Sequence, residues 1–168
     1  RERHAAVPNL TFAVGDADYE VFEDIVSTTK YHKRDDRLDW HLFNIAHHCS
    51  YRALAPEKGE KETIPTPKVK ELLKHGKPDA YMVSSSNQIS DDAEAYKQDQ
   101  PPHIQARKAY ERHLDELGGR KLLVTMEEPN GFHPEPMEFE ITDKGLRRAG
   151  KDRTGAAVAV GSVTPRAG

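Results

Sequence analysis

The sequence predicts a mainly α-helical fold with a small β-hairpin. Three observations lead to this prediction. Apolar residues recur at helical spacing over several long segments, whereas strict alternation of apolar and polar residues is confined to a short stretch near residue 139. Only 36% of the 168 residues are hydrophobic and 32% are charged, which favours a modest core with additional unpacked segments.

Residues 1–55 are expected to form an N-terminal helical region. A short strand is predicted over 9–14; Gly15 ends it, and Asp16 can cap a helix that runs to about residue 27. A second helix is predicted over 36–52, because its apolar residues recur at helical spacing. The stripe of this second helix would consist of Leu38, Leu42, Ile45, Ala46 and Cys49.

A charged linker, 56–65, is expected to follow, since this stretch is polar and bracketed by prolines. Thr66 followed by Pro67 then favours a helix start, and Gly76 is a natural stop. The last stretch, 151–168, is expected to be a basic flexible tail.

The segment from 103 to 117 has the most regular helical spacing of the chain, and Gly118-Gly119 ends it. Residues 121–128 are predicted to form a strand, and 137–141 a returning strand of a hairpin. Thr142 is predicted to cap a last helix with the sequence DKGLRRAG.

This order of elements resembles that of a winged helix-turn-helix. The segment YERHLDELGGRKLLV resembles the recognition helix and its exit, and FEITDKGLRRAG resembles the segment after the wing in MarR-like and PadR-like regulators. The resemblance covers roughly residues 66–150 as a winged-helix-like domain. It implies a non-enzymatic protein that binds double-stranded DNA, either a transcriptional regulator or an accessory factor of DNA transactions. By the same analogy, the N-terminal helices would form a dimer surface.

DNA binding would need hydrogen-bond donors and positive charge on the outer face of the 103–117 helix. The net charge of the chain is −3, but residues 103–121 contain five Lys or Arg against three Asp or Glu, and residues 144–168 contain six against one. An alternative is a structural subunit of a larger assembly, such as a virion or a ribonucleoprotein, in which the same module and the tail make protein contacts. The expected DNA contacts are Gln105, Arg107, Lys108 and Arg112, with Lys144, Arg147 and Arg148 on the flanking backbone.

The sequence contains neither of the glycine-rich patterns GxxxxGK[ST] and GxGxxG that cradle phosphates. We therefore expect no nucleotide cofactor and no enzymatic activity. The longest apolar run, Ala156 to Val160, is far shorter than the ~20 residues that a membrane-spanning helix needs, so we expect a cytoplasmic protein.

The densest group of potential metal ligands is His41, His47, His48 and Cys49, the only cysteine. On the predicted helix, His41 and His48 would share a face but lie two turns apart, and His47 would point elsewhere. This spacing argues against a single metal ion, and neighbouring side chains on a helix diverge, which argues against a Cys49–His48 nucleophile. We expect a structural role at a packing boundary.

Overall fold

A four-stranded parallel sheet lies at the centre of the protein. The computed structural model describes residues 10–142 and 145–149. The strands lie in the order of the sequence, β1-β2-β3-β4. Their bounds are β1 Thr11–Ala13, β2 Trp40–Ile45, β3 Gly76–Ser84 and β4 Lys121–Val124. The fold is therefore of the α/β class, and the prediction of a mainly α-helical fold is wrong.

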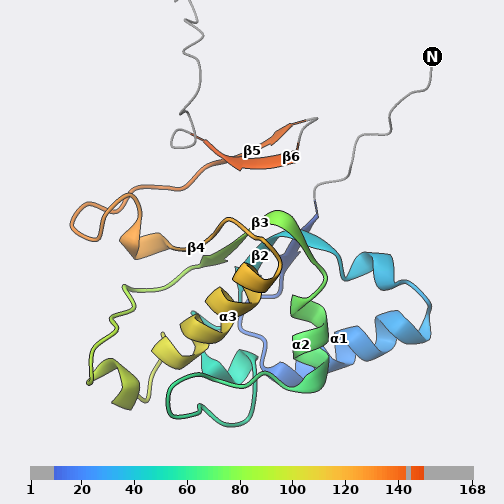
Figure 1. The fold of residues 1–168 in the computed structure, drawn as a ribbon, viewed down its shortest axis with the longest axis horizontal. Helices are drawn as coiled ribbons and strands as arrows, with labels where there is room; N and C mark the ends of the chain where they lie inside the picture. Colours follow the sequence, from blue (N-terminus) through green and yellow to red (C-terminus); the bar gives the residue numbers. More distant parts are fainter. Residues whose placement is uncertain (1–9, 143–144, 150–168) are drawn as a thin grey trace, which may run out of the picture.

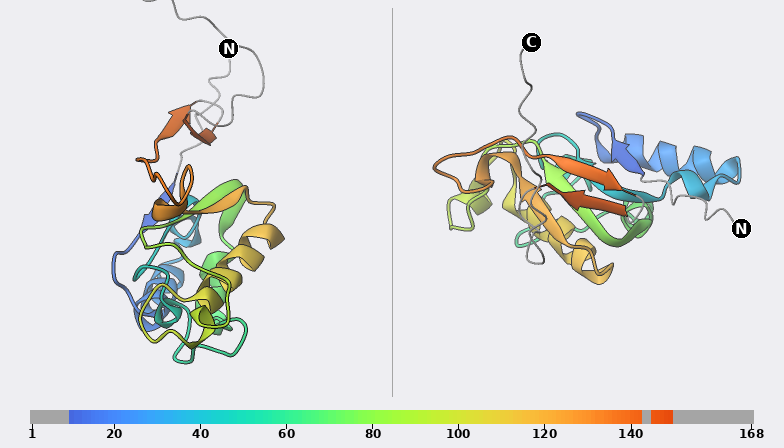
Figure 2. Two further views of the ribbon diagram at one scale, coloured as in Figure 1. Left: turned by 90° about the vertical axis from the view of Figure 1, so that its left-hand side faces the viewer. Right: turned by 90° about the horizontal axis from the view of Figure 1, so that it is seen from above.

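Three helices connect these strands: α1 Tyr19–Tyr31, α2 Pro67–Leu73 and α3 Ile104–Glu116. Parallel crossovers are right-handed, so a sheet that grows in one direction receives all its helices on one face. Figures 1 and 2 show this arrangement, with the three helices below the sheet. No helix among the described residues is long and apolar enough to cross a membrane. Short 3-10 turns lie at Asp35–Arg37, Tyr51–Ala53, Ala95–Lys97 and Thr125–Glu127.

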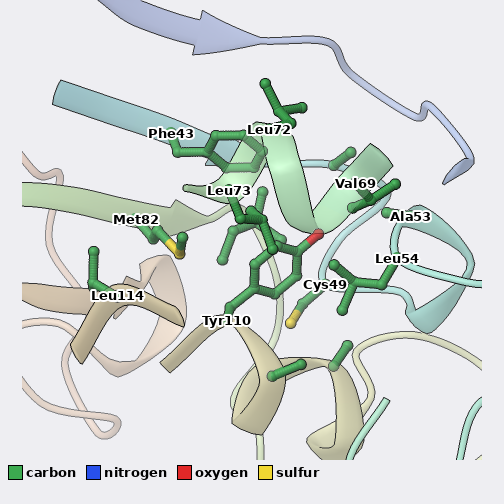
Figure 3. Packing of buried hydrophobic residues seen from close by; sticks show 14 of the residues in the cluster. Phe43, Cys49, Ala53, Leu54, Val69, Leu72, Leu73, Met82, Tyr110 and Leu114 are labelled. Carbon is green, nitrogen blue, oxygen red and sulfur yellow. The ribbon is translucent and has the colours of Figure 1, made fainter. Parts of the chain in front are cut away.

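The core lies between the sheet and the helices. One row of apolar side chains crosses all four strands in register, and it consists of Phe12, Phe43, Met82 and Leu122. Tyr110 of α3 is fully buried against this row, with its ring centroid 6.2 Å from that of Phe43. Figure 3 shows Tyr110 among side chains from α2 and from the chain after β2. The sheet and helices therefore share one continuous core.

The opposite face of the sheet carries a two-stranded antiparallel hairpin, β5 Phe139–Thr142 and β6 Gly145–Arg148 (Figure 2). Phe139 meets the ring of Tyr81 in β3 edge to face, at 5.4 Å between centroids. Arg148 of β6 pairs with Glu128 at 2.7 Å. These two contacts attach the hairpin to the sheet.

Residues 36–52 form strand β2 and two short turns, so the helix predicted there is wrong. The physical reason is that the register of β2 shifts between Trp40 and Leu42, so its buried residues Trp40 and Phe43 are three positions apart, a spacing that fits a helix as well as a strand. The aromatic residues Trp40 and Phe43 suit a strand, and both are buried on the helix side.

The C-terminal half departs from a winged helix in its strand pairing. β4 pairs in parallel with β3, whereas β5 pairs with β6, so the hairpin expected from 121–128 and 137–141 does not form. The predicted last helix is instead strand β6, since Gly145 with a φ of 114° turns the chain back onto β5. The helices predicted after Thr66 and after residue 103 are confirmed as α2 and α3.

Candidate functional site at the carboxyl edge of the sheet

Four loops meet where the parallel strands end. Parallel strands bring their carboxyl ends to one edge of a sheet, and ligands of open α/β folds bind in the crevice outside that edge. Here the loops after β2, β3 and β4 border an open pocket of about 490 Å³. Hydroxyl, amide and imidazole groups line it together with two prolines and a methionine. The lining residues are His48, Ser85, Ser86, Asn87, Pro101, Pro102, Thr125 and Met126.

The loop after β2 has an unusual backbone. Three successive residues that are not glycine, His47, His48 and Cys49, have φ values of 51°, 54° and 65°. Side chains disfavour this left-handed region, and such strain concentrates at functional sites. Backbone hydrogen bonds hold the loop, from Ser50 N to His47 O at 3.0 Å and from His47 N to Gly15 O at 3.1 Å. The loop after β2 is thus tied to the loop after β1.

This backbone places the His48 ring at the pocket. Its Nδ1 lies 2.7 Å from the carbonyl oxygen of Ser85. A carbonyl only accepts hydrogen bonds, so Nδ1 carries a proton and donates a hydrogen bond to Ser85. Nε2 lies 3.7 Å from Oδ1 of Asp16, and the His48 side chain is 56% exposed. A ligand can therefore reach an imidazole whose orientation is already set.

His47 turns the other way and joins the two loops. Its Nδ1 lies 3.2 Å from Oδ1 of Asp18, the residue that precedes α1. The second oxygen of Asp18 lies 3.5 Å from Nε of Arg52. Because both partners of Asp18 come from the chain after β2, this cluster is a brace between the first two loops.

A half-buried ion pair supports the pocket wall formed by the loop after β3. Arg107 of α3 donates to Glu127 at 2.9 Å and to the Ile89 carbonyl at 3.0 Å, and Glu127 accepts from the Ile89 amide at 2.8 Å. Burial opposes the charge of Arg107, but pairing with Glu111 and Glu127 outweighs it and raises the Arg107 pKa. This bridge fixes the chain immediately after Ser85–Asn87.

The carboxyl edge is acidic. Its four loops, residues 14–18, 46–55, 85–102 and 125–133, contain eight Asp or Glu and only two Lys or Arg. Asp18 precedes the first turn of α1, and its side chain bonds to His47 and Arg52 rather than to the first amides of the helix. Five of the eight carboxylates form ion pairs with Lys or Arg, whereas Asp16, Asp92 and Asp99 form none within the described residues. The unpaired charge of the edge is therefore negative, which disfavours an anionic ligand.

Cys49 takes no part in this surface. Its side chain is fully buried, and burial raises its pKa to about 12. A thiol in that state is a poor nucleophile at neutral pH. Within residues 10–142 and 145–149, no three His, Cys, Asp or Glu side chains are grouped so that they could hold a metal ion.

The residues expected to contact DNA lie elsewhere, and most serve internal contacts. Gln105 is 1% exposed and donates to the Tyr96 carbonyl. Lys108 pairs with Asp91, and Arg112 with Glu62 and Glu116.

Arg107 joins the bridge described above. In the hairpin, Arg147 pairs with Glu140 and Arg148 with Glu128. Lys144 lies outside the described residues. The basic side chains of α3 thus hold neighbouring loops in place, and DNA binding by this set stays a prediction.

The site at the carboxyl edge was not predicted from the sequence, although the chain carries a signal for it. Each strand of the parallel sheet ends in an apolar run that is followed by mostly small or polar residues, as in FAV-GDAD, FNIA-HHCS, YMV-SSSN and LLVT-MEEPN. Four such runs separated by helices are typical of parallel sheets with a site at the strand ends. Comparison with known protein families, with curated proteins and with solved structures finds no match to this chain.

Proposed function

We propose that this protein binds a small neutral or cationic molecule rich in hydroxyl or amide groups at the carboxyl edge of its sheet. The observation that carries the proposal is the pocket of about 490 Å³, in which His48, oriented by Ser85, faces the same space as Asn87 and Thr125. A volume in this range suits a small organic ligand. The lining offers hydrogen bonds on several sides, which favours a polyhydroxylated ligand of nucleoside or aminosugar size.

The charge of the edge narrows the ligand class. The three carboxylates of the edge that pair with no Lys or Arg among the described residues, Asp16, Asp92 and Asp99, disfavour phosphorylated or carboxylated ligands. Asp16 lies next to His48 and is exposed, so it can accept hydrogen bonds from hydroxyl or ammonium groups.

Matched ligand pairs test the proposal. Adenosine is compared with adenosine monophosphate, and glucosamine with its 6-phosphate, by chemical-shift perturbation of the ¹⁵N-labelled protein. The expected result is that the member without phosphate binds, with perturbed signals at His48, Ser85, Asn87 and Thr125. If no neutral or cationic member of a wider panel of nucleosides, sugars and amines perturbs these signals, the proposal is wrong.

A substitution that fills the pocket gives the matched control. Asn87 is an exposed residue of the lining, so Asn87→Trp would block the pocket without entering the core. Thr28→Trp places the same side chain on an exposed position of α1, away from the pocket. Binding should be lost in the first variant and kept in the second; equal binding by both variants would refute the assignment of the pocket.

Double-stranded-DNA binding through α3 remains a separate proposal that rests on the sequence resemblance alone. Its contacts would require Arg107, Lys108 and Arg112 to give up their carboxylate partners. Titration of a random-sequence duplex with wild type and with an Arg107→Ala/Arg112→Ala variant tests it. An unchanged affinity of the double variant would exclude this helix as the contact.

A further inference from the structure

The amino edge of the sheet carries the opposite charge to the carboxyl edge. Helix α1 runs back across the sheet, so it begins at the carboxyl edge and ends at the amino edge. Its last turn and the residues after it read KYHKRDDR, and α2 and the residues after it read PKVKELLKHGK. Residues 27–37 and 66–77 together contain eight Lys or Arg and three Asp or Glu. We call these two segments the basic surface.

The two segments form one surface because α1 and α2 lie side by side (Figure 1). Lys30 of α1 pairs with Glu71 of α2, and Lys68 Nζ lies 2.7 Å from Ser27 Oγ. Lys33 and Lys74 are exposed and form no ion pair with a carboxylate in the described part of the chain. The basic surface thus keeps cations free for a partner.

An exposed aromatic ring lies within this surface. Tyr31 is 83% exposed, and its ring meets that of His32 edge to face at 5.1 Å between centroids. The two rings are adjacent in the sequence, with Lys30 before them and Lys33 and Arg34 after them. The basic residues at the end of α1 carry more positive charge than stabilisation of the helix C-terminus requires. The dipole there is equivalent to only about half an elementary charge.

We propose that the basic surface binds single-stranded nucleic acid, with Tyr31 stacking on a base and three lysines of the surface that lack a carboxylate partner among the described residues, Lys33, Lys70 and Lys74, contacting phosphates. Proteins that bind single strands combine a cationic track with aromatic side chains on which bases stack. A lipid surface fits less well, since one tyrosine is the only large apolar side chain exposed in residues 27–37. This proposal is independent of the pocket at the carboxyl edge.

The test is fluorescence anisotropy with a labelled 20-nucleotide oligothymidine and a duplex of equal length, at low and moderate salt. The single strand should bind more tightly than the duplex, and log affinity should fall linearly with log salt. Tyr31→Ala should weaken single-strand binding by about fivefold or more, because stacking on an aromatic ring contributes at that scale.

Charge reversal supplies the matched control. Lys33→Glu and Lys97→Glu change the net charge equally, but Lys97 is an exposed residue of the loop after β3, on the acidic edge. The affinity should fall about tenfold for Lys33→Glu, because the variant loses one phosphate contact and the new carboxylate repels neighbouring phosphates. It should change little for Lys97→Glu. An equal loss in both variants, no binding at low salt, or binding only to vesicles containing phosphatidylserine would each overturn the proposal.

Discussion

Replacement of Tyr110 by phenylalanine should stabilise the protein. The Tyr110 side chain is completely buried, and its hydroxyl has no hydrogen-bond partner among the residues that the structure describes. The same burial raises the Tyr110 pKa well above its ordinary value, so the group is a neutral hydroxyl at every accessible pH. Folding therefore removes a polar group from water without compensation.

The size of the gain follows from that desolvation. A buried donor or acceptor without a partner costs about 1–3 kcal/mol, whereas the ring itself keeps all its packing in the variant. We expect Tyr110→Phe to raise the free energy of unfolding by about 1–2 kcal/mol, which corresponds to a rise in Tm of roughly 2–6 °C for a chain of this length.

Urea denaturation followed by circular dichroism measures this change. Tyr31→Phe is the matched control, since its hydroxyl lies on an 83% exposed side chain and its loss should leave stability unchanged. If Tyr110→Phe instead lowers the free energy of unfolding, the hydroxyl must be hydrogen-bonded in solution, and the packing around it in Figure 3 would be incorrect.

Three further predictions concern stability and reactivity. Burial lowers the pKa of His41, His103 and His113. The unfolded chain therefore binds more protons than the folded one below pH ~6.5, and urea titrations should show the free energy of unfolding falling as the pH drops through that value. A rise in the free energy of unfolding would contradict the burial of these rings. A Cβ atom at Gly76 would lie 2.5 Å from Cζ2 of Trp40, so Gly76→Ala should lower the free energy of unfolding by about 1–3 kcal/mol. Wild-type stability in this variant would show that the close contact is absent. Cys49, with its pKa raised to about 12 by burial, should react with iodoacetamide only after unfolding, and rapid labelling of the native protein would disprove its burial.

Local signals predicted several elements correctly, because they depend on neighbours in the chain. Pro67 at the first turn defines the start of α2, and the apolar spacing in 103–117 defines α3. β2 was assigned to a helix because its neighbours β1 and β3 are distant in sequence, and only their pairing decides that WHLFNI is extended.

The candidate site was missed for the same reason. His47 and His48 were placed on a helix, where their side chains would diverge, and a metal or nucleophile at that position was disfavoured on helical spacing. In the structure they lie in a left-handed loop whose partners, Asp16, Asp18 and Ser85, come from two other loops. The four apolar runs of the sequence indicate where strands end, but which loops then meet depends on the order of the strands in the sheet.

The separation of charge between the two edges of the sheet makes the molecule an electric dipole. Acidic loops gather at the carboxyl ends of the strands, whereas the basic surface of α1 and α2 lies toward their amino ends. In the field of a polyanion this dipole experiences a torque that turns the basic surface toward the polyanion and the pocket away from it. A chain captured on a nucleic acid would thus be oriented before contact, with the mouth of its pocket facing solvent and open to a small ligand.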